Sequence, residues 1–269
     1  MMAENILQTI AAHSRRLVAA AKLRVSEGEL VERAQALSPG DPRAFERALC
    51  GPGLSLICEV KRASPSKGLI ARDFSPVDIA RTYEEAGADA ISCLTEPRWF
   101  RGSLDHLREI AATVPVPVMR KDFVVDAYQL YEAKLAGAKA VLLLTAILDD
   151  EELARLMALA EELGLGTLVE VYSAEEVRRA VGVGARVIGV NNRDLRDFSV
   201  DFGNARRMRA LIPSDAVYVA ESGVGSLDDV ATIARMGADA ALVGEFLMRA
   251  EDKVSLLAQM RTVAGGEAR

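Results

Sequence analysis

The chain has 269 residues, of which 50% are hydrophobic and 27% are charged, as in an ordinary globular protein with a substantial core. Its formal net charge of −6 argues against a general surface for nucleic acid or anionic membranes. No apolar run reaches the roughly 18 residues of a membrane span. Charged residues also interrupt the N-terminal segment, unlike a signal peptide. We therefore expect a cytoplasmic protein that binds neither nucleic acid nor membrane.

Cysteine and histidine are scarce, which limits redox and metal chemistry. Cys50, Cys58 and Cys93 are isolated and form no CxxC pair, which predicts thiols that stay reduced. The two histidines, His13 and His106, fall in helix-like segments, and neither has a second candidate ligand nearby in the sequence. We therefore expect no metal site.

The N-terminal region is predicted to be helical. Ile6, Ile10 and Leu17 recur at helical spacing, which predicts an amphipathic helix, and a second helix is expected over 26–37. The segment SPGDP at 38–42 predicts a turn that leads into a short helix. We expect a helical extension over residues 1–48 that belongs to the same domain as residues 49–269.

A weak repeat organises the chain after residue 50. A helix end, a glycine and a short apolar strand recur around Gly87, Gly137, Gly184 and Gly237. Glycine suits the position after a helix, because the chain there adopts a left-handed conformation that is costly for other residues. Counting the copies that lack this signature, apolar runs predict eight strands, at 54–60, 90–94, 116–120, 140–144, 166–171, 186–190, 216–220 and 240–243. Helical patterns lie between them, for example at 75–86, 127–136, 150–163, 174–181 and 226–236.

Strict alternation of strands and helices leaves two main architectures, an open doubly wound sheet and a closed (β/α)8 barrel. A doubly wound NAD-binding fold should carry GxGxxG directly after its first strand, where this chain has KRASPS. Eight strand–helix units in roughly 220 residues fit the barrel. We therefore predict an α/β fold, a single (β/α)8 TIM barrel over 49–269 with an N-terminal helical extension.

Charged and amide side chains gather where the predicted strands end. Glu59 and Lys61 should share one face of the first strand, because successive side chains alternate. For that segment alone, a structural ion pair is the alternative to a functional role. In (β/α)8 barrels the active site lies at the C-terminal ends of the strands. Four more predicted strands end in the same way, with Lys121, Glu170, Asn191 and Glu221.

Two lysines, three carboxylates and an amide would then converge over the barrel axis. Opposed ammonium and carboxylate groups in a semi-enclosed cavity perturb one another's pKa, which suits general acid and base catalysis. A Ser-His-Asp or Cys-His arrangement does not fit, because the histidines lie elsewhere in the chain. A lysine could instead form a Schiff base, so the residues alone leave an aldolase-type reaction open.

Two glycine-containing turns follow the last two predicted strands. SGVG begins at Ser222, and GEFLM begins at Gly244. Exposed backbone N–H groups in such turns, together with a helix N-terminus, form the phosphate site that these barrels often place there. We therefore expect the ligand to carry a phosphate group.

Short motifs along the whole barrel carry a resemblance to one family. They are EVKRASPSKG from Glu59, LTEP from Leu94, FRGS from Phe100, RKDF from Arg120, LVEV from Leu168, GVNNRDL from Gly189 and ESG from Glu221. The chain resembles indole-3-glycerol-phosphate synthase, the ring-closing enzyme of tryptophan biosynthesis, with its motifs in the family's order. That family also has a helical extension before its barrel. EVKRASPSKG and RKDF are the most specific of these motifs.

The resemblance implies a reaction and its acid and base residues. The substrate would be 1-(o-carboxyphenylamino)-1-deoxyribulose 5-phosphate, which closes its ring with loss of CO₂ and water. Lys121 would be the general acid that protonates the carbonyl oxygen, and Glu170 would be the general base. Lys61 would hold the substrate carboxylate and supply a proton for dehydration, with Glu59 assisting.

The resemblance also implies the substrate contacts. Asn191 and Glu221 would orient the reacting groups, and Arg193 would make a further contact. A small phosphorylated molecule is the expected partner, no metal or organic cofactor is implied, and we expect a monomer or weak homo-oligomer. An apolar slot for the aromatic ring would be formed by Pro65, Phe100, Phe123 and Leu195. The phosphate would be bound by Ser64, Ser222, Gly223, Gly244 and the backbone of Glu245.

Two alternatives differ in chemistry from this synthase. Another phosphosugar barrel, such as a phosphoribosyl isomerase or a Schiff-base aldolase, would need a different set of strand-end residues. A catalytically silent phosphosugar-binding barrel or an assembly partner would have no reason to keep every charged strand end. The sequence departs from the family at Phe246, where a small residue is usual. Asn192, beside Asn191, is assigned no role in the site.

Overall fold

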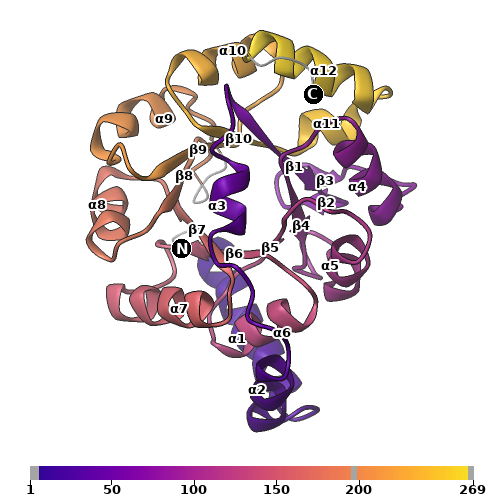
Figure 1. Cartoon of the computed structure of the whole chain (residues 1–269), viewed down its shortest axis with the longest axis vertical. Helices are drawn as coiled ribbons and strands as arrows, with labels where there is room; N and C mark the ends of the chain where they lie inside the picture. The colour runs from indigo at the N-terminus through magenta and orange to yellow at the C-terminus, as the bar shows by residue number, and fades with distance from the viewer. Residues whose placement is uncertain (1–5, 195–198, 266–269) are drawn as a thin grey trace, which may run out of the picture.

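A closed barrel forms the body of the protein. The computed structural model describes residues 6–194 and 199–265. Within them, eight parallel strands close in the order β1-β10-β9-β8-β7-β6-β5-β4, with helices around the outside (Figure 1). The predicted (β/α)8 barrel is therefore confirmed. Its strands are β1 Ser55–Val60, β4 Ala90–Leu94, β5 Val118–Lys121, β6 Ala140–Leu144, β7 Gly166–Val171, β8 Val187–Asn191, β9 Val217–Glu221 and β10 Ala240–Val243.

Three strands extend one residue further than the apolar runs predict. β5, β8 and β9 end at Lys121, Asn191 and Glu221, which still pair with neighbouring strands in the parallel ladder. The prediction ended the strands at Arg120, Val190 and Ala220, although a polar side chain at the open end of a barrel can still belong to the sheet. These functional candidates are therefore held by the sheet itself.

The helices follow the strands as the repeat predicts. The glycine after a helix has positive φ at all four predicted positions, from +74° at Gly237 to +91° at Gly87. Ser173 caps its helix by accepting a hydrogen bond from the Glu176 N–H. The barrel helices are α4 Pro76–Glu85, α5 Leu104–Ala111, α6 Tyr128–Leu135, α7 Asp150–Glu162, α8 Ala174–Gly182, α9 Gly203–Met208 with the 3₁₀ turn η1 Arg209–Leu211, α10 Leu227–Arg235, α11 Glu245–Arg249 and α12 Lys253–Val263.

Three helices precede the barrel: α1 Ile6–Lys22, α2 Glu27–Gln35 and α3 Ala44–Ala48. The first two lie beside α6, where Val18, Leu30 and Tyr128 form a small buried cluster (Figure 1). The third covers the N-terminal end of the barrel, because the buried Phe45 packs against Gly166 at the start of β7. This end of the barrel is thus covered by α3.

Apolar side chains fill the barrel below the strand ends. Ile57, Met119 and Leu168 are fully buried and share the faces of the charged residues two positions further along β1, β5 and β7. A two-stranded ribbon of β2 Ala63–Ser64 and β3 Gly68–Leu69 follows β1. No helix in the described parts of the chain is both long and apolar enough to cross a membrane.

Candidate active site

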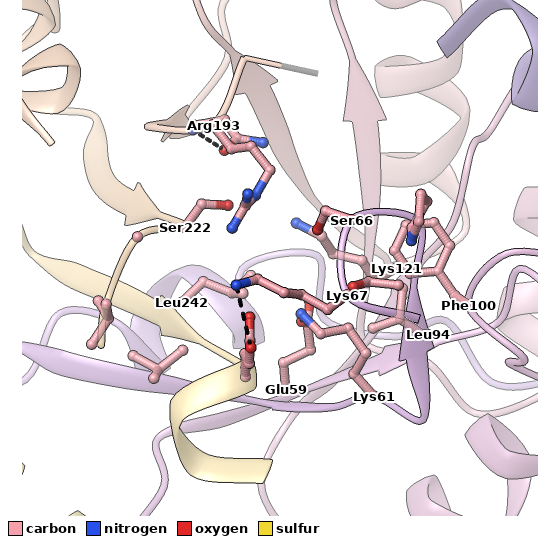
Figure 2. A pocket seen from close by; sticks show the side chains of 18 of the residues that line it. Glu59, Lys61, Ser66, Lys67, Leu94, Phe100, Lys121, Arg193, Ser222 and Leu242 are labelled. Atoms are coloured by element: carbon pink, nitrogen blue, oxygen red, sulfur yellow. Dashed lines mark hydrogen bonds and ion pairs between the residues drawn. The ribbon is translucent and has the colours of Figure 1, made fainter. Parts of the chain in front are cut away.

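A cavity of about 510 Å³ opens at the C-terminal ends of the strands. Figure 2 shows Glu59, Lys61 and Lys121 close together within it, with Phe100 on one side and Ser222 and Arg193 on the other. The predicted site residues that line it are Glu59, Lys61, Ser64, Pro65, Phe100, Lys121, Phe123, Glu170, Asn191, Arg193, Ser222, Gly223, Gly244 and Glu245. Glu221 joins them through a contact with Lys121. Leu195 lies outside the described residues.

Lys61 folds back onto Glu59, as their predicted common face requires. The Lys61 Nζ lies 2.5 Å from the Glu59 Oε1, and Glu59 is buried. Burial raises the pKa of Glu59, but the positive charges of Lys61 and Lys121 outweigh burial and lower this pKa below its usual range. Glu59 is therefore an ionised carboxylate at neutral pH.

Lys121 lies between two carboxylates from other strands. Its Nζ is 2.5 Å from the Glu221 Oε2 and 3.2 Å from the Glu170 Oε2. Burial alone would lower the pKa of Lys121, but the negative charges of Glu221 and Glu170 raise it. The lysine therefore carries a proton, as a general acid must before the reaction begins.

Glu221 is one of three carboxylates that face the two site lysines. Burial raises the pKa of Glu221 to about 8, although the ammonium of Lys121 opposes this shift. Its Oε1 has no hydrogen-bond partner among the described residues. Near neutral pH this carboxyl group can thus exchange a proton.

Asn191 orients the carboxylate of Glu170. The Asn191 Nδ2 donates to the Glu170 Oε1 over 2.8 Å, and the Asn191 Oδ1 accepts from the Arg193 N–H over 2.9 Å. The amide is therefore fixed at both ends. With one oxygen of Glu170 bound to Asn191 and the other to Lys121, a base and an acid lie side by side.

Two glycines leave room for the buried carboxylates. A methyl group on Gly189 would overlap with the Glu221 Oε1, and one on Gly244 would overlap with the Glu59 Oε1 and lie 2.8 Å from the Lys61 Nζ. Any larger residue at either position must displace a charged group. The glycine after β10 therefore serves the charged site as well as the turn that was predicted there.

The first of the two turns predicted to bind phosphate has an unusual backbone conformation. Ser222 has φ = +65° and Gly223 has φ = +90°. A positive φ is costly for serine and persists where the surrounding structure enforces it, often at functional sites. In the second turn, Gly244 precedes α11, and the Glu245 carboxylate contacts Arg249 at 2.9 Å and Lys67 at 3.8 Å. These two cations offset its negative charge beside the predicted phosphate site.

The aromatic side of the cavity is built on two phenylalanines. The ring centroids of Phe100 and Phe123 are 6.2 Å apart, and Pro65 also lines this part of the cavity. This apolar wall is formed by three of the residues expected to hold the aromatic ring. It lies across the cavity from Ser222 (Figure 2).

The sequence analysis missed two buried residues that hold the site loops. Glu96 accepts hydrogen bonds from the backbone N–H groups of three residues, including Phe100 at 3.0 Å. The sequence signal that could have revealed Glu96 is a carboxylate directly before Pro97 and a loop. Asn192 is completely buried and donates to the Ser222 carbonyl oxygen. Alternation of side chains along the strand places Asn191, and not Asn192, toward the barrel axis, so only Asn191 was predicted to be a site residue.

Arg120 and Asp122 flank Lys121 in sequence and form an ion pair, and Asp122 also lines the cavity. The Arg120 Nη2 lies 2.9 Å from the Asp122 Oδ2, and its Nη1 lies 3.1 Å from the Glu132 Oε2. Both residues are buried. The RKDF motif thus places Lys121 and Phe123 in the cavity and joins Arg120 to Asp122 in a buried ion pair beside them.

No group of three or more histidine, cysteine, aspartate or glutamate side chains suited to a metal ion occurs in residues 6–194 and 199–265. The acid and base candidates of the cavity are lysines and glutamates. These groups are suited to proton transfer without a further group.

Comparison of the chain with known proteins identifies its relatives. The family model of indole-3-glycerol phosphate synthase matches residues 7–260. The indole-3-glycerol phosphate synthase of Ruminiclostridium cellulolyticum is 47% identical over 256 residues, which cover 95% of this chain and 98% of that protein. The enzyme of the same name from Lactiplantibacillus plantarum is 48% identical over 255 residues, with coverage of 93% and 98%.

Solved structures with low sequence identity support the fold. 3-Hexulose-6-phosphate synthase from Salmonella typhimurium superposes with a TM-score of 0.63 at 16% identity and covers 78% of this chain and 98% of its own. A mandelate oxidase complex gives a TM-score of 0.61 at 20% identity, with coverage of 78% and 74%. At these identities the similarities show the fold alone. The family match and the two close relatives span the N-terminal helices, the barrel and every part of the cavity, and the chain therefore belongs to the indole-3-glycerol phosphate synthase family.

Proposed function

We propose that the protein is a carboxy-lyase of tryptophan biosynthesis that converts 1-(o-carboxyphenylamino)-1-deoxyribulose 5-phosphate to indole-3-glycerol phosphate. One observation carries this proposal most directly. A protonated Lys121, held by Glu221 and Glu170, lies between an aromatic slot and a phosphate-type turn. The substrate has the same order of parts, with a reactive ketone between an aromatic ring and a phosphate.

The first chemical step forms the new carbon–carbon bond. The ring carbon that carries the carboxylate attacks the ketone carbon, and Lys121 gives its proton to the ketone oxygen, which becomes a hydroxyl group. Loss of CO₂ from the same ring carbon then restores aromaticity. Lys121 regains its proton from solvent. The proton transfers because the ketone oxygen becomes more basic as it takes on negative charge.

The second chemical step removes water. Lys61 supplies a proton to the departing hydroxyl group, and Glu170 takes a proton from the neighbouring methylene carbon, which leaves the indole double bond. Glu59 holds the Lys61 ammonium through their 2.5 Å contact. Asn191 presents the Glu170 carboxylate in one orientation. Each proton given and taken is thus assigned to one group.

The two ends of the substrate are proposed to bind on opposite sides of the cavity. Phe100 and Phe123 would hold the aromatic ring, and Lys61 would meet its carboxylate. The phosphate would be bound by Ser64 and by the turns at Ser222–Gly223 and Gly244–Glu245, with Arg193 contacting the substrate between the two ends. A substrate fixed at both ends places the reacting carbons within bonding reach.

The test is product formation by purified protein without added metal. The proposed function predicts equal amounts of CO₂ and of an indole product that carries the glycerol phosphate chain. Binding of the substrate without CO₂ release would instead establish a silent phosphosugar-binding barrel. A lysine adduct trapped by borohydride would establish the Schiff-base alternative.

A further inference from the structure

Asn192 is held in place beside the first phosphate turn. It follows β8, is 0% exposed, and is absent from the lining of the cavity. Its backbone N–H donates to the Glu221 carbonyl oxygen over 2.8 Å, and its own carbonyl oxygen accepts from the Asp201 N–H over 2.8 Å. The backbone on both sides of the Asn192 α-carbon is therefore fixed.

The side chain of Asn192 bridges two loops. Its Nδ2 donates to the Ser222 carbonyl oxygen over 3.2 Å, and its Oδ1 accepts from the Ala205 N–H over 2.9 Å. With the amide turned over, its oxygen would face the Ser222 carbonyl oxygen and its NH₂ group would face the Ala205 N–H. The two partners therefore define the orientation of the amide. The bridge ties the turn after β9 to α9.

This bridge fixes the plane of one peptide unit. In a trans peptide the C=O and the following N–H point in opposite directions. Because Asn192 holds the Ser222 carbonyl, the Gly223 N–H points the opposite way. Gly223 lines the cavity, and its N–H donates to no acceptor in the described parts of the chain. The left-handed conformation of Ser222, at φ = +65°, needs such an external restraint.

We propose that Asn192 is a positioning residue for the substrate phosphate. It holds the Ser222–Gly223 peptide so that the Gly223 N–H is presented to a phosphate oxygen, and it does not touch the substrate itself. The inference deepens the proposed function in one respect, since it rests on binding of the phosphate at this turn.

A change from asparagine to aspartate isolates the donor. Asn192→Asp keeps the size and the acceptor for Ala205, but an ionised carboxylate turns an acceptor toward the Ser222 carbonyl. Affinity for inorganic phosphate should fall by about tenfold, as expected when a buried carbonyl loses its donor. KM for the substrate should rise by a similar factor, while kcat changes much less. Protonation restores a donor, so the ratio of variant to wild-type affinity should recover as the pH is lowered.

Gln129 provides a matched control. This buried amide of α6 donates to the Phe123 carbonyl oxygen over 3.1 Å and accepts from the Val125 N–H over 2.8 Å. Both partners lie in the loop before α6, on the aromatic side of the cavity. Gln129→Glu removes the same kind of donor there. It should leave phosphate affinity at the wild-type value at every pH. Asn192→Ala provides a second test without an added charge if Asn192→Asp does not fold.

The experiment measures the dissociation constant of inorganic phosphate by calorimetry for these variants and for Gly223→Ala, over a range of pH. Gly223→Ala tests the turn itself, because alanine is strained at φ = +90°. Loss of affinity in Gly223→Ala and Asn192→Asp, with recovery of the latter at low pH, supports the proposal. Loss in Gly223→Ala alone overturns the role of Asn192. Unchanged affinity in both places the phosphate elsewhere and overturns the proposed site.

Discussion

The Lys121 Nζ lies 2.5 Å from the Oε2 of Glu221, a carboxylate that is 1% exposed. The ammonium group at the end of β5 is thus held from the opposite wall of the barrel by the end of β9. Since Glu59 and Glu170 also face this site, its carboxylates outnumber Lys61 and Lys121. Burial raises the pKa of the Glu221 carboxyl, and the negative charges of Glu170 and Glu59 raise it further.

Replacement of Glu221 by glutamine should change how stability depends on pH. The pKa of Glu221 rises from an ordinary 4.5 to about 8 on folding, chiefly through burial. A carboxyl with a raised folded-state pKa contributes its full stability below the unfolded pKa and loses it as the pH rises through the folded pKa. The free energy of unfolding of the wild type should therefore fall relative to that of Glu221→Gln between pH 4.5 and 8. Chemical denaturation at several pH values measures it.

The same denaturation experiment can also contradict a raised pKa of Glu221. If the difference between the two proteins stayed constant from pH 4.5 to 8, Glu221 would be ionised in the folded protein throughout this interval. The proton would then reside on another group of the cluster.

Gly189→Ala should destabilise the protein and impair the site at once. The added methyl group would overlap with the Glu221 carboxylate and lie 3.1 Å from the Leu168 Cδ1. Overpacking of this kind costs about 1–3 kcal/mol, or roughly 2–4 °C in Tm per kcal/mol. Gly28→Ala is the control, because a methyl group there meets no atom within 4 Å. It lies in α2 and should gain about 0.5–1 kcal/mol. A Gly189→Ala protein with unchanged Tm would mean that Glu221 can move aside freely.

Asp122→Asn tests the assignment of the Arg120–Asp122 pair to structure. The two side chains are 6% and 7% exposed, and removal of one charge from a buried pair costs about 3–5 kcal/mol. Asp105→Asn breaks an exposed pair with Arg108 and should cost less than about 1 kcal/mol. Denaturant titration compares the two. Equal, small losses would show that the Arg120–Asp122 pair adds nothing to stability.

Local patterns in the sequence were sufficient to predict the barrel architecture and to predict which side chains of a strand share a face. The glycine after four of the helices and the apolar runs predicted eight strand–helix units, and the alternation of side chains placed Glu59 with Lys61. Each of these signals lies within a few residues. Because parallel strands meet at one end, strand order alone then brought Lys121 and Glu170 together.

Contacts between distant loops could not be predicted in this way. The Asn192 amide reaches Ser222, and the need for Gly189 comes from a carboxylate on another strand. Neither residue has a local pattern that reveals its partner. The division of RKDF into Lys121 in the cavity and Arg120 outside it follows from alternation, but the partners of Arg120 depend on the packing of α6.

The most direct test of the proposed mechanism is the rate of indole formation by Lys121→Ala under saturating substrate, measured by fluorescence beside the wild type. If Lys121 is the general acid of ring closure, kcat should fall by at least about 10²–10⁴, while affinity for inorganic phosphate stays at the wild-type value. Turnover near the wild-type rate would contradict the central claim and would require the proton to come from another group, with Lys61 the nearest candidate.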